Sequence, residues 1–441
     1  MDERVPMRRR DPREAIGDFG EVALGYSRAE AVAEARRVRG ADLAAARSAC
    51  PFDVDLAGMV AALAADDFEA ARDIVHRAHV WPGILGRWCQ KPCEAAVAGQ
   101  GPGAPFLSAL ERAVGDHAPP RAPKIPPVTS GRRVAVIGAG SAGSAAALSL
   151  ARRGHMVRLY DRLPVPGGMM AAGYPEFRLP LAVVTRETDP RALGVDFVSE
   201  IVVDRALVAS LLATFDAVVV ATGKFQPATL GVPGETLAGV HDALDLLTRV
   251  KFGERPSLGD DVLVIGGGNT ARDASRVARR LGARARVVYR RRAEDMPVKK
   301  SEIPRYLAQQ AAEGIDYLFE RAPVGLVGQN GHVVAAEFCR TRVDEQGRMR
   351  ASEDERETIA CTSVVVATGE SAGLDHLPPD AEIDGGHVRV DAGTFATRVP
   401  KLFAVGALAG TRTTMEAFAS GFACANAIDA SFAATGRLAR A

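Results

Sequence analysis

The sequence predicts an α/β protein in which two doubly wound parallel sheets follow a smaller α-helical domain. Short β-branched runs alternate with Ala- and Arg-rich helical segments after residue 130. A unit of strand, glycine-rich turn, helix and strand occurs twice, at 132–161 and at 261–292, and internal repetition on this scale indicates two domains of common design. The 441 residues allow about three domains at roughly 100 to 200 residues each.

The first part of the chain, residues 1–117, is expected to be α-helical. Asp66 and Asp67 precede apolar residues at helical spacing and predict a capped helix that begins at Phe68. Residues 118–130 are expected to form a stiff linker, because the tract 118–127 holds five prolines in ten residues and cannot form a helix or a central strand.

Composition excludes several classes of partner. Lys+Arg 55 against Asp+Glu 54 gives a net charge of +1, so no global field would attract nucleic acid or an anionic membrane. The apolar stretch 134–151 has the length of a membrane span but is interrupted by glycines and serines. The first 13 residues carry charges and no apolar core of a secretory signal, so a cytoplasmic location is expected. Six cysteines in such a chain do not predict a disulfide framework.

The first glycine motif predicts a dinucleotide site. Gly138, Gly140 and Gly143 follow an apolar strand and open an amphipathic helix, the context in which this spacing binds a pyrophosphate at a helix N-terminus. Asp161 ends the next strand, 23 residues after Gly138, where a carboxylate can accept hydrogen bonds from ribose hydroxyls. The alternative is a glycine-rich turn without a ligand.

The second unit predicts a second dinucleotide site with a different preference. Gly266, Gly268 and Ala271 form a variant of the same motif, and the following strand ends in Arg290 and Arg291 with no acid. Guanidinium groups pair with a 2′-phosphate, which an acid would repel. NADP(H) is therefore favoured, and NAD(H) remains the alternative if these arginines are only a solvated edge.

The glycine motifs and several further stretches resemble the small subunit of bacterial glutamate synthase and its relatives, which include the N-terminal part of dihydropyrimidine dehydrogenase. The resemblance runs from about Cys50 to the C-terminus, about nine tenths of the chain. The matching stretches are 138–143, 166–180, 221–223, 266–283, 289–297, 367–370 and 402–428.

The resemblance implies a glutathione reductase-like plan of two Rossmann-like dinucleotide-binding domains behind an α-helical iron-sulfur-type domain. FAD fills the first dinucleotide domain, which would comprise 131–236 and 371–441, and NAD(P)H binds the inserted domain between them, 237–370. A helix that begins near Thr413 would point its N-terminus toward the flavin. The cofactor-binding residues expected on this basis are Gly138, Gly140, Ser141, Ala142, Gly143, Asp161, Arg162, Gly168, Met169, Arg178, Thr222, Gly223, Gly266, Gly268, Asn269, Thr270, Arg290, Arg291, Thr368, Gly369, Gly406, Ala407, Thr413 and Thr414.

One position departs from the family. Ala407 stands where relatives usually have an aspartate that holds the ribityl chain of FAD. Losing one such hydrogen bond would weaken FAD binding by about 1 to 3 kcal/mol, which a large buried cofactor can absorb.

The resemblance also gives the N-terminal cysteines a role. The family carries two [4Fe-4S] clusters here, and the ligands of the first are replaced, with Val97 at the final position and no cysteine in 36–49. The second set is retained and would hold one [4Fe-4S] cluster. Its ligands would be Cys50, Cys89, Cys93 and Glu111. Zinc on the same donors, or reduced structural thiols in a docking domain, are the alternatives.

The remaining cysteines, Cys339, Cys361 and Cys424, lie apart in apolar settings and are expected to be core thiols. The chain has no CxxC motif, which argues against a thiol-disulfide reductase.

The expected activity is that of an FAD-dependent NAD(P)H:acceptor oxidoreductase subunit. Nicotinamide delivers two electrons as a hydride and a cluster accepts one at a time, so a flavin joins them and no side chain need act as acid or base. The expected partner is a protein: an iron-sulfur or 2-oxoacid:acceptor oxidoreductase-type complex, or a large glutamate synthase-like subunit. Two alternatives stay open, a glutamate synthase small subunit proper and a non-catalytic scaffold or NAD(P)-sensing subunit without redox centres.

Overall fold

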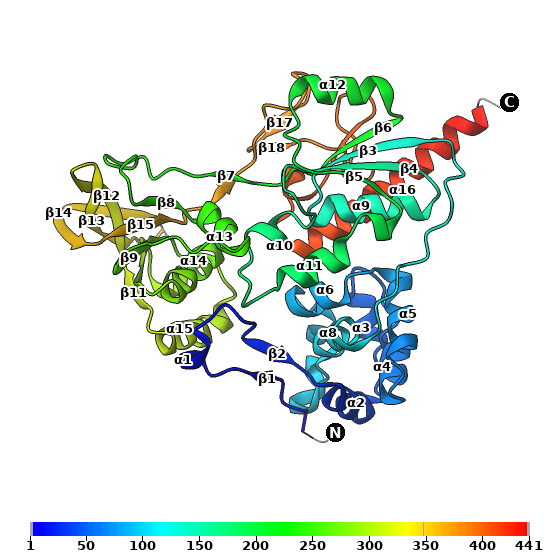
Figure 1. Ribbon diagram of the computed structural model, residues 1–441, viewed down its shortest axis with the longest axis horizontal. Coiled ribbons are helices and arrows are strands. Elements are labelled where there is room, and N and C mark those ends of the chain that lie inside the picture. The colour runs from blue at the N-terminus through cyan, green and yellow to red at the C-terminus, as the bar shows by residue number, and fades with distance from the viewer. Residues whose placement is uncertain (1–2, 347, 439–441) are drawn as a thin grey trace.

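The structure, a computed structural model, describes residues 3–346 and 348–438. Figure 1 shows a helical body below, the first dinucleotide domain above it and the inserted domain to the left. None of the helices in the described residues is both long and apolar enough to span a bilayer.

The helical domain is a compact set of short helices. The predicted cap is confirmed, because the Asp67 carboxylate accepts a hydrogen bond from the Ala70 backbone N–H at 2.9 Å at the start of α5. The helices of this domain are α2 (Arg28–Val38), α3 (Ala44–Ala49), α4 (Leu56–Ala64), α5 (Phe68–Ala78), α6 (Pro82–Trp88), α7 (Pro92–Ala96) and α8 (Leu107–His117).

An N-terminal arm precedes these helices and was not expected from the sequence. It contains β1 (Arg8–Arg9), α1 (Pro12–Ala15) and β2 (Ala23–Gly25). Ala15 and Val22 are buried in the core of the inserted domain, so the arm ties the start of the chain to a distant domain.

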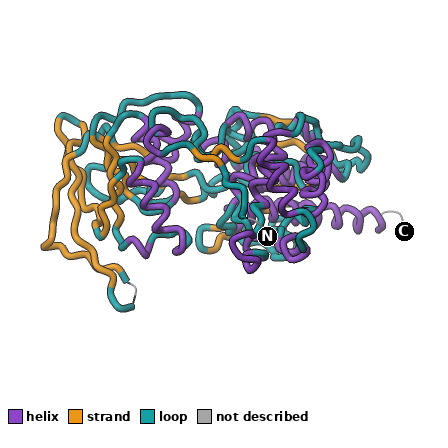
Figure 2. The backbone as a smooth tube through the Cα atoms, turned by 90° about the horizontal axis from the view of Figure 1, so that it is seen from below, coloured by secondary structure: helices purple, strands orange, loops and turns teal. Residues whose placement is uncertain are grey.

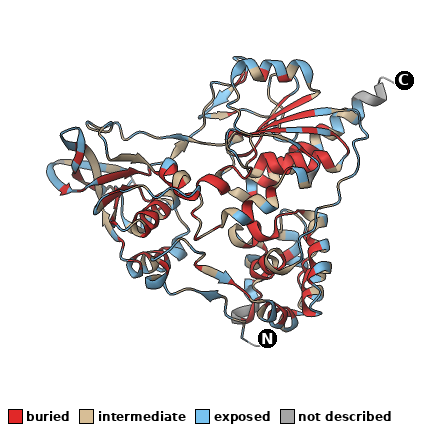
Figure 3. Ribbon diagram, viewed as in Figure 1, coloured by how far each residue is buried: buried red, intermediate tan, exposed pale blue. Residues whose placement is uncertain are grey.

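The first dinucleotide domain has a five-stranded parallel sheet in the order β19-β6-β3-β4-β5. Helices α9 and α16 pack against each other on one face of this sheet, and α12 packs on the other face. The strands between these two layers of helices are buried (Figure 3). The elements are β3 (Arg133–Ile137), α9 (Ser141–Arg152), β4 (Met156–Tyr160), α10 (Met169–Ala172), α11 (Leu181–Thr188), β5 (Asp196–Val198), α12 (Arg205–Thr214), β6 (Ala217–Val220), β17 (Ile383–Asp384), β18 (His387–Val388), β19 (Leu402–Ala404) and α16 (Thr414–Leu438).

The inserted domain repeats this plan with the order β11-β10-β9-β15-β8. Helices α13 and α14 cover one face, and a three-stranded antiparallel sheet covers the other, seen at the left end of the molecule in Figure 2. The sequence did not predict this second sheet. The elements are β8 (Val240–Asp242), α13 (Ala243–Lys251), β9 (Asp261–Ile265), α14 (Asn269–Arg280), β10 (Arg284–Tyr289), α15 (Ile303–Ala312), β11 (Asp316–Phe319), β12 (Arg321–Gln329), β13 (His332–Val343), β14 (Met349–Ala360) and β15 (Ser363–Val366).

Two chain crossings join the dinucleotide domains. The short strands β7 (Gln226–Pro227) and β16 (Glu370–Ser371) pair in antiparallel fashion where the chain leaves the first domain and returns to it. The helical domain shares an apolar core with the first dinucleotide domain, because Trp81, Ile84 and Leu85 of the α6 region pack in the same core as α9 and α16.

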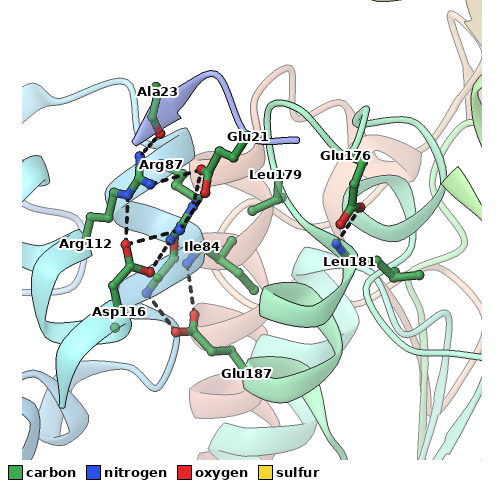
Figure 4. A network of polar contacts seen from close by, with 12 residues as sticks. Glu21, Ala23, Ile84, Arg87, Arg112, Asp116, Glu176, Leu179, Leu181 and Glu187 are labelled. Carbon is green, nitrogen blue, oxygen red and sulfur yellow. Dashed lines mark hydrogen bonds and ion pairs between the residues drawn. The ribbon is translucent and has the colours of Figure 1, made fainter. Parts of the chain in front are cut away.

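A buried carboxylate reinforces that attachment. The Glu187 side chain of α11 accepts hydrogen bonds from the backbone N–H groups of Gly83 at 2.8 Å and Ile84 at 2.9 Å, at the N-terminus of α6 (Figure 4). Burial, the largest cause, nevertheless raises the pKa of Glu187 from the usual 4.5 to about 7.

The raised pKa predicts a pH-dependent contribution to stability. Glu187 stabilises the fold fully below pH 4.5 and loses up to about 3 kcal/mol of that contribution as the pH rises to about 7. We expect the melting temperature of Glu187→Gln to rise relative to that of the wild type as the pH increases from about 5 to about 8. The exposed Glu69→Gln variant is the control and should show no such trend; parallel pH profiles for all three proteins would contradict the assignment.

Candidate functional site

The turn between β3 and α9 requires glycine at two positions. Gly138 has φ +104°, and a Cβ atom there would lie 2.4 Å from the Ala221 carbonyl oxygen. A Cβ atom on Gly143 would lie 1.7 Å from the Gly138 carbonyl oxygen. The motif therefore brings the helix against the strand so closely that no side chain fits, which leaves the N-terminus of α9 open to a ligand.

Asp161 supports this turn as well as facing the cavity beside it. Its Oδ2 atom accepts from the Ala139 N–H at 2.6 Å and its Oδ1 atom from the Leu163 N–H at 2.8 Å. Burial raises the pKa of this carboxyl group. Each carboxylate oxygen can accept a second hydrogen bond, so Asp161 can still bind ribose hydroxyls.

Two adjoining cavities follow the turn, with volumes of about 560 and 370 Å³. They share Gly138, Asp161, Thr222, Gly223 and Phe225, and their extended joint shape suits a dinucleotide. The predicted residues that line the larger cavity are Gly138, Gly140, Ser141, Ala142, Asp161, Gly168, Met169, Thr222, Gly223, Gly406, Ala407, Thr413 and Thr414.

Three other predicted residues are not among the described residues that line the larger cavity. Arg162 lines the smaller cavity, with its guanidinium 4.4 Å from the centroid of the Phe225 ring. Gly143 and Arg178 are not among the described residues that line either cavity. Gly143 serves the helix–strand contact, and Arg178 forms an ion pair with Asp273 of α14 in the inserted domain.

The larger cavity is also lined by residues that were not among those expected to bind the cofactor. They include Tyr174, Lys224, Phe225, Glu370, His387, Thr411 and Arg412. Lys224 Nζ lies 2.9 Å from His387 Nε2, so two groups distant in sequence meet at its wall. Glu370, His387, Thr411 and Arg412 lie in the segment of the chain that returns to the first domain. Their position beside the cavity depends on the tertiary fold, so no local sequence pattern predicts it.

Two hydroxyl groups test whether the larger cavity fits FAD. Thr222 Oγ1 and Thr411 Oγ1 are buried, and neither has a hydrogen-bond partner within the described protein. Buried hydroxyls are normally paired, and both residues line the cavity, so a ligand with phosphate and hydroxyl groups would satisfy them. Thr411 lies four residues after Ala407, where the resemblance implies an aspartate in relatives, and both residues line the cavity.

The second glycine motif opens onto a cavity of about 610 Å³. Gly266 has φ +150°, and a Cβ atom there would lie 2.2 Å from the Ala367 carbonyl oxygen. The predicted residues that line the cavity are Gly266, Gly268, Thr270, Arg290, Arg291, Thr368 and Gly369. Asn269 begins α14 but is not among the described lining residues.

The charge of this cavity matches a phosphate. Its charged lining residues, among those described, are Arg290, Arg291 and Arg321. Arg321, which the sequence analysis missed, lies on β12 of the antiparallel sheet and is already paired with Glu357 at 2.7 Å. Arg290 and Arg291 are exposed at the end of β10, where they can turn toward a 2′-phosphate.

The two dinucleotide cavities meet at a hydrogen bond. Thr270 lines the second cavity, and its hydroxyl donates to Glu370 Oε1 at 3.4 Å, on a residue that lines the first. Burial raises the pKa of Glu370. A nicotinamide and a flavin bound in these cavities would therefore approach each other here.

The predicted cluster ligands converge in the helical domain. Cys50 and Cys89 follow the last residues of α3 and α6, Cys93 lies in α7 and Glu111 in α8. Burial, the largest cause, together with the charges of Glu111 and Cys50 raises the pKa of both Cys89 and Cys93 to about 12. One buried thiol, two partly buried thiols and a carboxylate that interact electrostatically suit a cluster, which binds thiolates and displaces their protons.

Unsatisfied polar atoms border these ligands. Glu111 Oε1 lies 3.3 Å from His79 Nε2, yet both atoms are buried without a hydrogen bond to any described group. A ligand that binds the Glu111 carboxylate would satisfy one of them. No three His, Cys, Asp or Glu side chains of the described chain are arranged to hold a single metal ion.

The other thiols are confirmed as core residues, since Cys339, Cys361 and Cys424 are all buried. Val97 is also buried in the core of the helical domain, and Ala46 beside it lies in the segment that would carry the first cluster. Apolar side chains therefore occupy these two positions.

Comparisons with known proteins agree with this geometry. Residues 132–421 match the family model described as pyridine nucleotide-disulphide oxidoreductase, and residues 15–121 match dihydropyrimidine dehydrogenase domain II, 4Fe-4S cluster. The β subunit of NADP(+)-dependent formate dehydrogenase from Moorella thermoacetica is 32% identical over 93% of this chain and 64% of its own length. The glutamate synthase [NADPH] small chain of Escherichia coli is 32% identical over 82% of each chain.

A solved structure shows the same fold at low identity. FprA from Mycobacterium tuberculosis has a TM-score of 0.58 with 19% identity, over 70% of this chain and 86% of its own. The expected fold class and resemblance are thus confirmed, and FAD, NADP(H) and a [4Fe-4S] cluster are the cofactors that the matched domains use. The chain belongs to the pyridine nucleotide-disulphide oxidoreductase family, and residues 15–121 on its N-terminal side match a 4Fe-4S domain.

Proposed function

We propose that this chain is the electron-transfer subunit of a larger redox enzyme. It exchanges electrons between NADP(H), FAD and one [4Fe-4S] cluster, and through the cluster with a partner protein. The hydrogen bond between Thr270 and Glu370 carries this proposal, because it joins the wall of the arginine-lined cavity to the wall of the cavity that fits FAD.

The chemistry needs little from side chains. FAD would supply the step from a two-electron hydride to single electrons. The protein would hold one dinucleotide in each of the two cavities whose walls meet at Thr270 and Glu370. Cys50, Cys89, Cys93 and Glu111 would hold the cluster against the first dinucleotide domain, whose core Cys89 contacts.

The proposed partner is a protein subunit other than the large subunit of glutamate synthase. Relatives named as subunits include the formate dehydrogenase chain and the β subunit of NADPH-Fe(3+) oxidoreductase from Geobacter sulfurreducens, 30% identical over 76% of this chain and 52% of its own length. The chain spans about two thirds of the first of these and about half of the second. Buried Val97 in place of a first-cluster ligand favours an assembly that uses one cluster here. We propose that it acts in the cytoplasm.

Purified protein tests the proposal against the scaffold alternative. Anaerobic preparations should absorb at about 450 nm from bound flavin and bleach when NADPH is added. Iron analysis and EPR after reduction should show one [4Fe-4S] cluster. Colourless, iron-free protein isolated with its native partner would support a scaffold instead.

Coenzyme choice gives a sharper prediction. The double variant Arg290→Gln/Arg291→Gln should lose about tenfold or more in kcat/KM for NADPH and little for NADH, since each charged hydrogen bond to the 2′-phosphate is worth about 1.5 to 3 kcal/mol. The measurement is flavin reduction with each coenzyme.

The adjacent Arg292 offers a matched control. It pairs with Asp295 at 2.9 Å and is not among the described residues that line the cavity. Arg292→Gln should leave the ratio of the two coenzymes unchanged. Equal losses with NADPH and NADH in the double variant would remove the argument for a 2′-phosphate site.

A further inference from the structure

An aromatic stack connects the helical domain to the proposed flavin cavity. Trp88 ends α6 and directly precedes Cys89. Its ring stacks on that of Tyr174, with centroids 3.7 Å apart and planes inclined by 23°. Tyr174 follows α10 in the first dinucleotide domain and lines the larger cavity. One pair of rings therefore spans the distance from a predicted cluster ligand to the cavity wall.

Polar contacts hold both rings in place. The Tyr174 hydroxyl lies 2.7 Å from Thr414 Oγ1, at the first residue of α16, which lines the same cavity. The Arg178 guanidinium lies 4.2 Å from the centroid of the Trp88 ring and forms an ion pair with Asp273 of the inserted domain. The stack is thus fixed at the place where all three domains meet.

We infer that Trp88 and Tyr174 form the electron-transfer route between the flavin and the cluster. The inference rests on the proposed function, because it needs both cofactors in their cavities. Electronic coupling between two redox centres falls steeply across gaps without atoms, and a stacked ring pair leaves no such gap. Cys89, the predicted ligand next to Trp88, packs against the core of the first dinucleotide domain, so the route is covered on the cluster side as well.

The transfer changes no bond in either side chain. With both cofactors bound, electrons would pass singly from the two-electron-reduced FAD to the oxidised cluster, the partner protein would take up each electron in turn, and the protons of the reduced FAD would go to solvent. The rings of Trp88 and Tyr174 serve as the medium between the two centres and end each turnover unchanged.

Rapid kinetics test the route. After mixing with NADPH, flavin reduction and cluster reduction are followed separately, and the ratio of the two rates is compared. Trp88→Leu and Tyr174→Leu should slow cluster reduction about tenfold relative to flavin reduction, because each opens a gap in the packed path. Trp88→Phe keeps a ring and should retain most of the rate. The matched control is Trp81→Phe, which alters the other tryptophan of the chain in the same interface, where it packs on Phe418 at 4.5 Å.

A second readout requires bound FAD but neither NADPH nor the cluster. An excited flavin takes an electron from a nearby aromatic ring, which quenches its emission, so the emission lifetime of bound FAD reports the same coupling. The lifetime should lengthen severalfold in Tyr174→Leu and in Trp88→Leu and stay short in Trp81→Phe. If Trp88→Leu loses its iron, the lifetime and the cluster reduction rate of Tyr174→Leu decide.

The outcomes separate the two proposals. Wild-type ratios and wild-type lifetimes in both leucine variants, at full flavin and iron content, would overturn the route and leave the proposed function intact. Equal slowing in Trp81→Phe would show that general packing of the interface is responsible, which also overturns the route. Wild-type protein that binds no flavin would instead refute the proposed function.

Discussion

Cys89→Ser should lose almost all of the iron of the helical domain and the EPR signal of its reduced cluster. Cys89 directly follows α6 in the interface with the first dinucleotide domain, and burial already raises the pKa of its thiol to about 12. A metal centre would make a thiolate favourable in such a setting, because ligation displaces the proton. A serine hydroxyl binds iron far more weakly than a thiolate, so three remaining ligands should not retain the cluster.

Cys361→Ser is the matched control. Cys361 is buried, and burial raises the pKa of its thiol to about 11, but it lies in the core of the inserted domain. Its replacement should leave the iron content unchanged. Full iron in Cys89→Ser would exclude Cys89 as a ligand, and equal loss in both variants would point to unfolding in place of ligand removal.

Arg87→Met should destabilise the protein by about 3 to 5 kcal/mol, because it removes a buried guanidinium from two carboxylates that are only 16% and 19% exposed. Arg87 is 5% exposed and forms ion pairs with Glu21 at 2.7 Å and Asp116 at 2.8 Å (Figure 4). Arg112 contacts the same two carboxylates at 3.1 and 3.0 Å, so one guanidinium would have to neutralise both. Since Glu21 belongs to the N-terminal arm, the arm should also become sensitive to proteolysis.

The exposed ion pair of Arg28 with Asp66 gives the comparison. The Arg28 side chain is 49% exposed, and Arg28→Met should cost no more than about 1 kcal/mol. Denaturant unfolding of the three proteins, with limited proteolysis of the arm, measures the difference. Similar midpoints for the Arg87 and Arg28 variants would show that the buried network does not hold the arm and the helical domain together.

Local patterns in the sequence determined the class of this protein. The turns at Gly138 and Gly266 can be predicted from the sequence because their backbone conformation requires glycine. Asp161 and Arg290, at the ends of the next strands, follow these turns at the spacing of the motif. The helix cap at Asp67 is equally local, since one side chain meets a backbone group three residues away. These features need only neighbours along the chain.

Contacts between distant segments were decided by the tertiary structure. The N-terminal arm crosses to the inserted domain through single small apolar residues such as Ala15, which form no periodic pattern. The antiparallel sheet of the inserted domain, with Arg321, depends on pairing between strands whose polar faces resemble loop sequence. Trp88 and Tyr174 lie 86 positions apart in the printed sequence, and only the packing of α6 against the first dinucleotide domain stacks their rings. The sequence thus determined which cofactors this protein binds, because the glycine turns that bind dinucleotides are local sequence patterns. The path between the cofactors depends on surfaces that come into contact only when the domains pack.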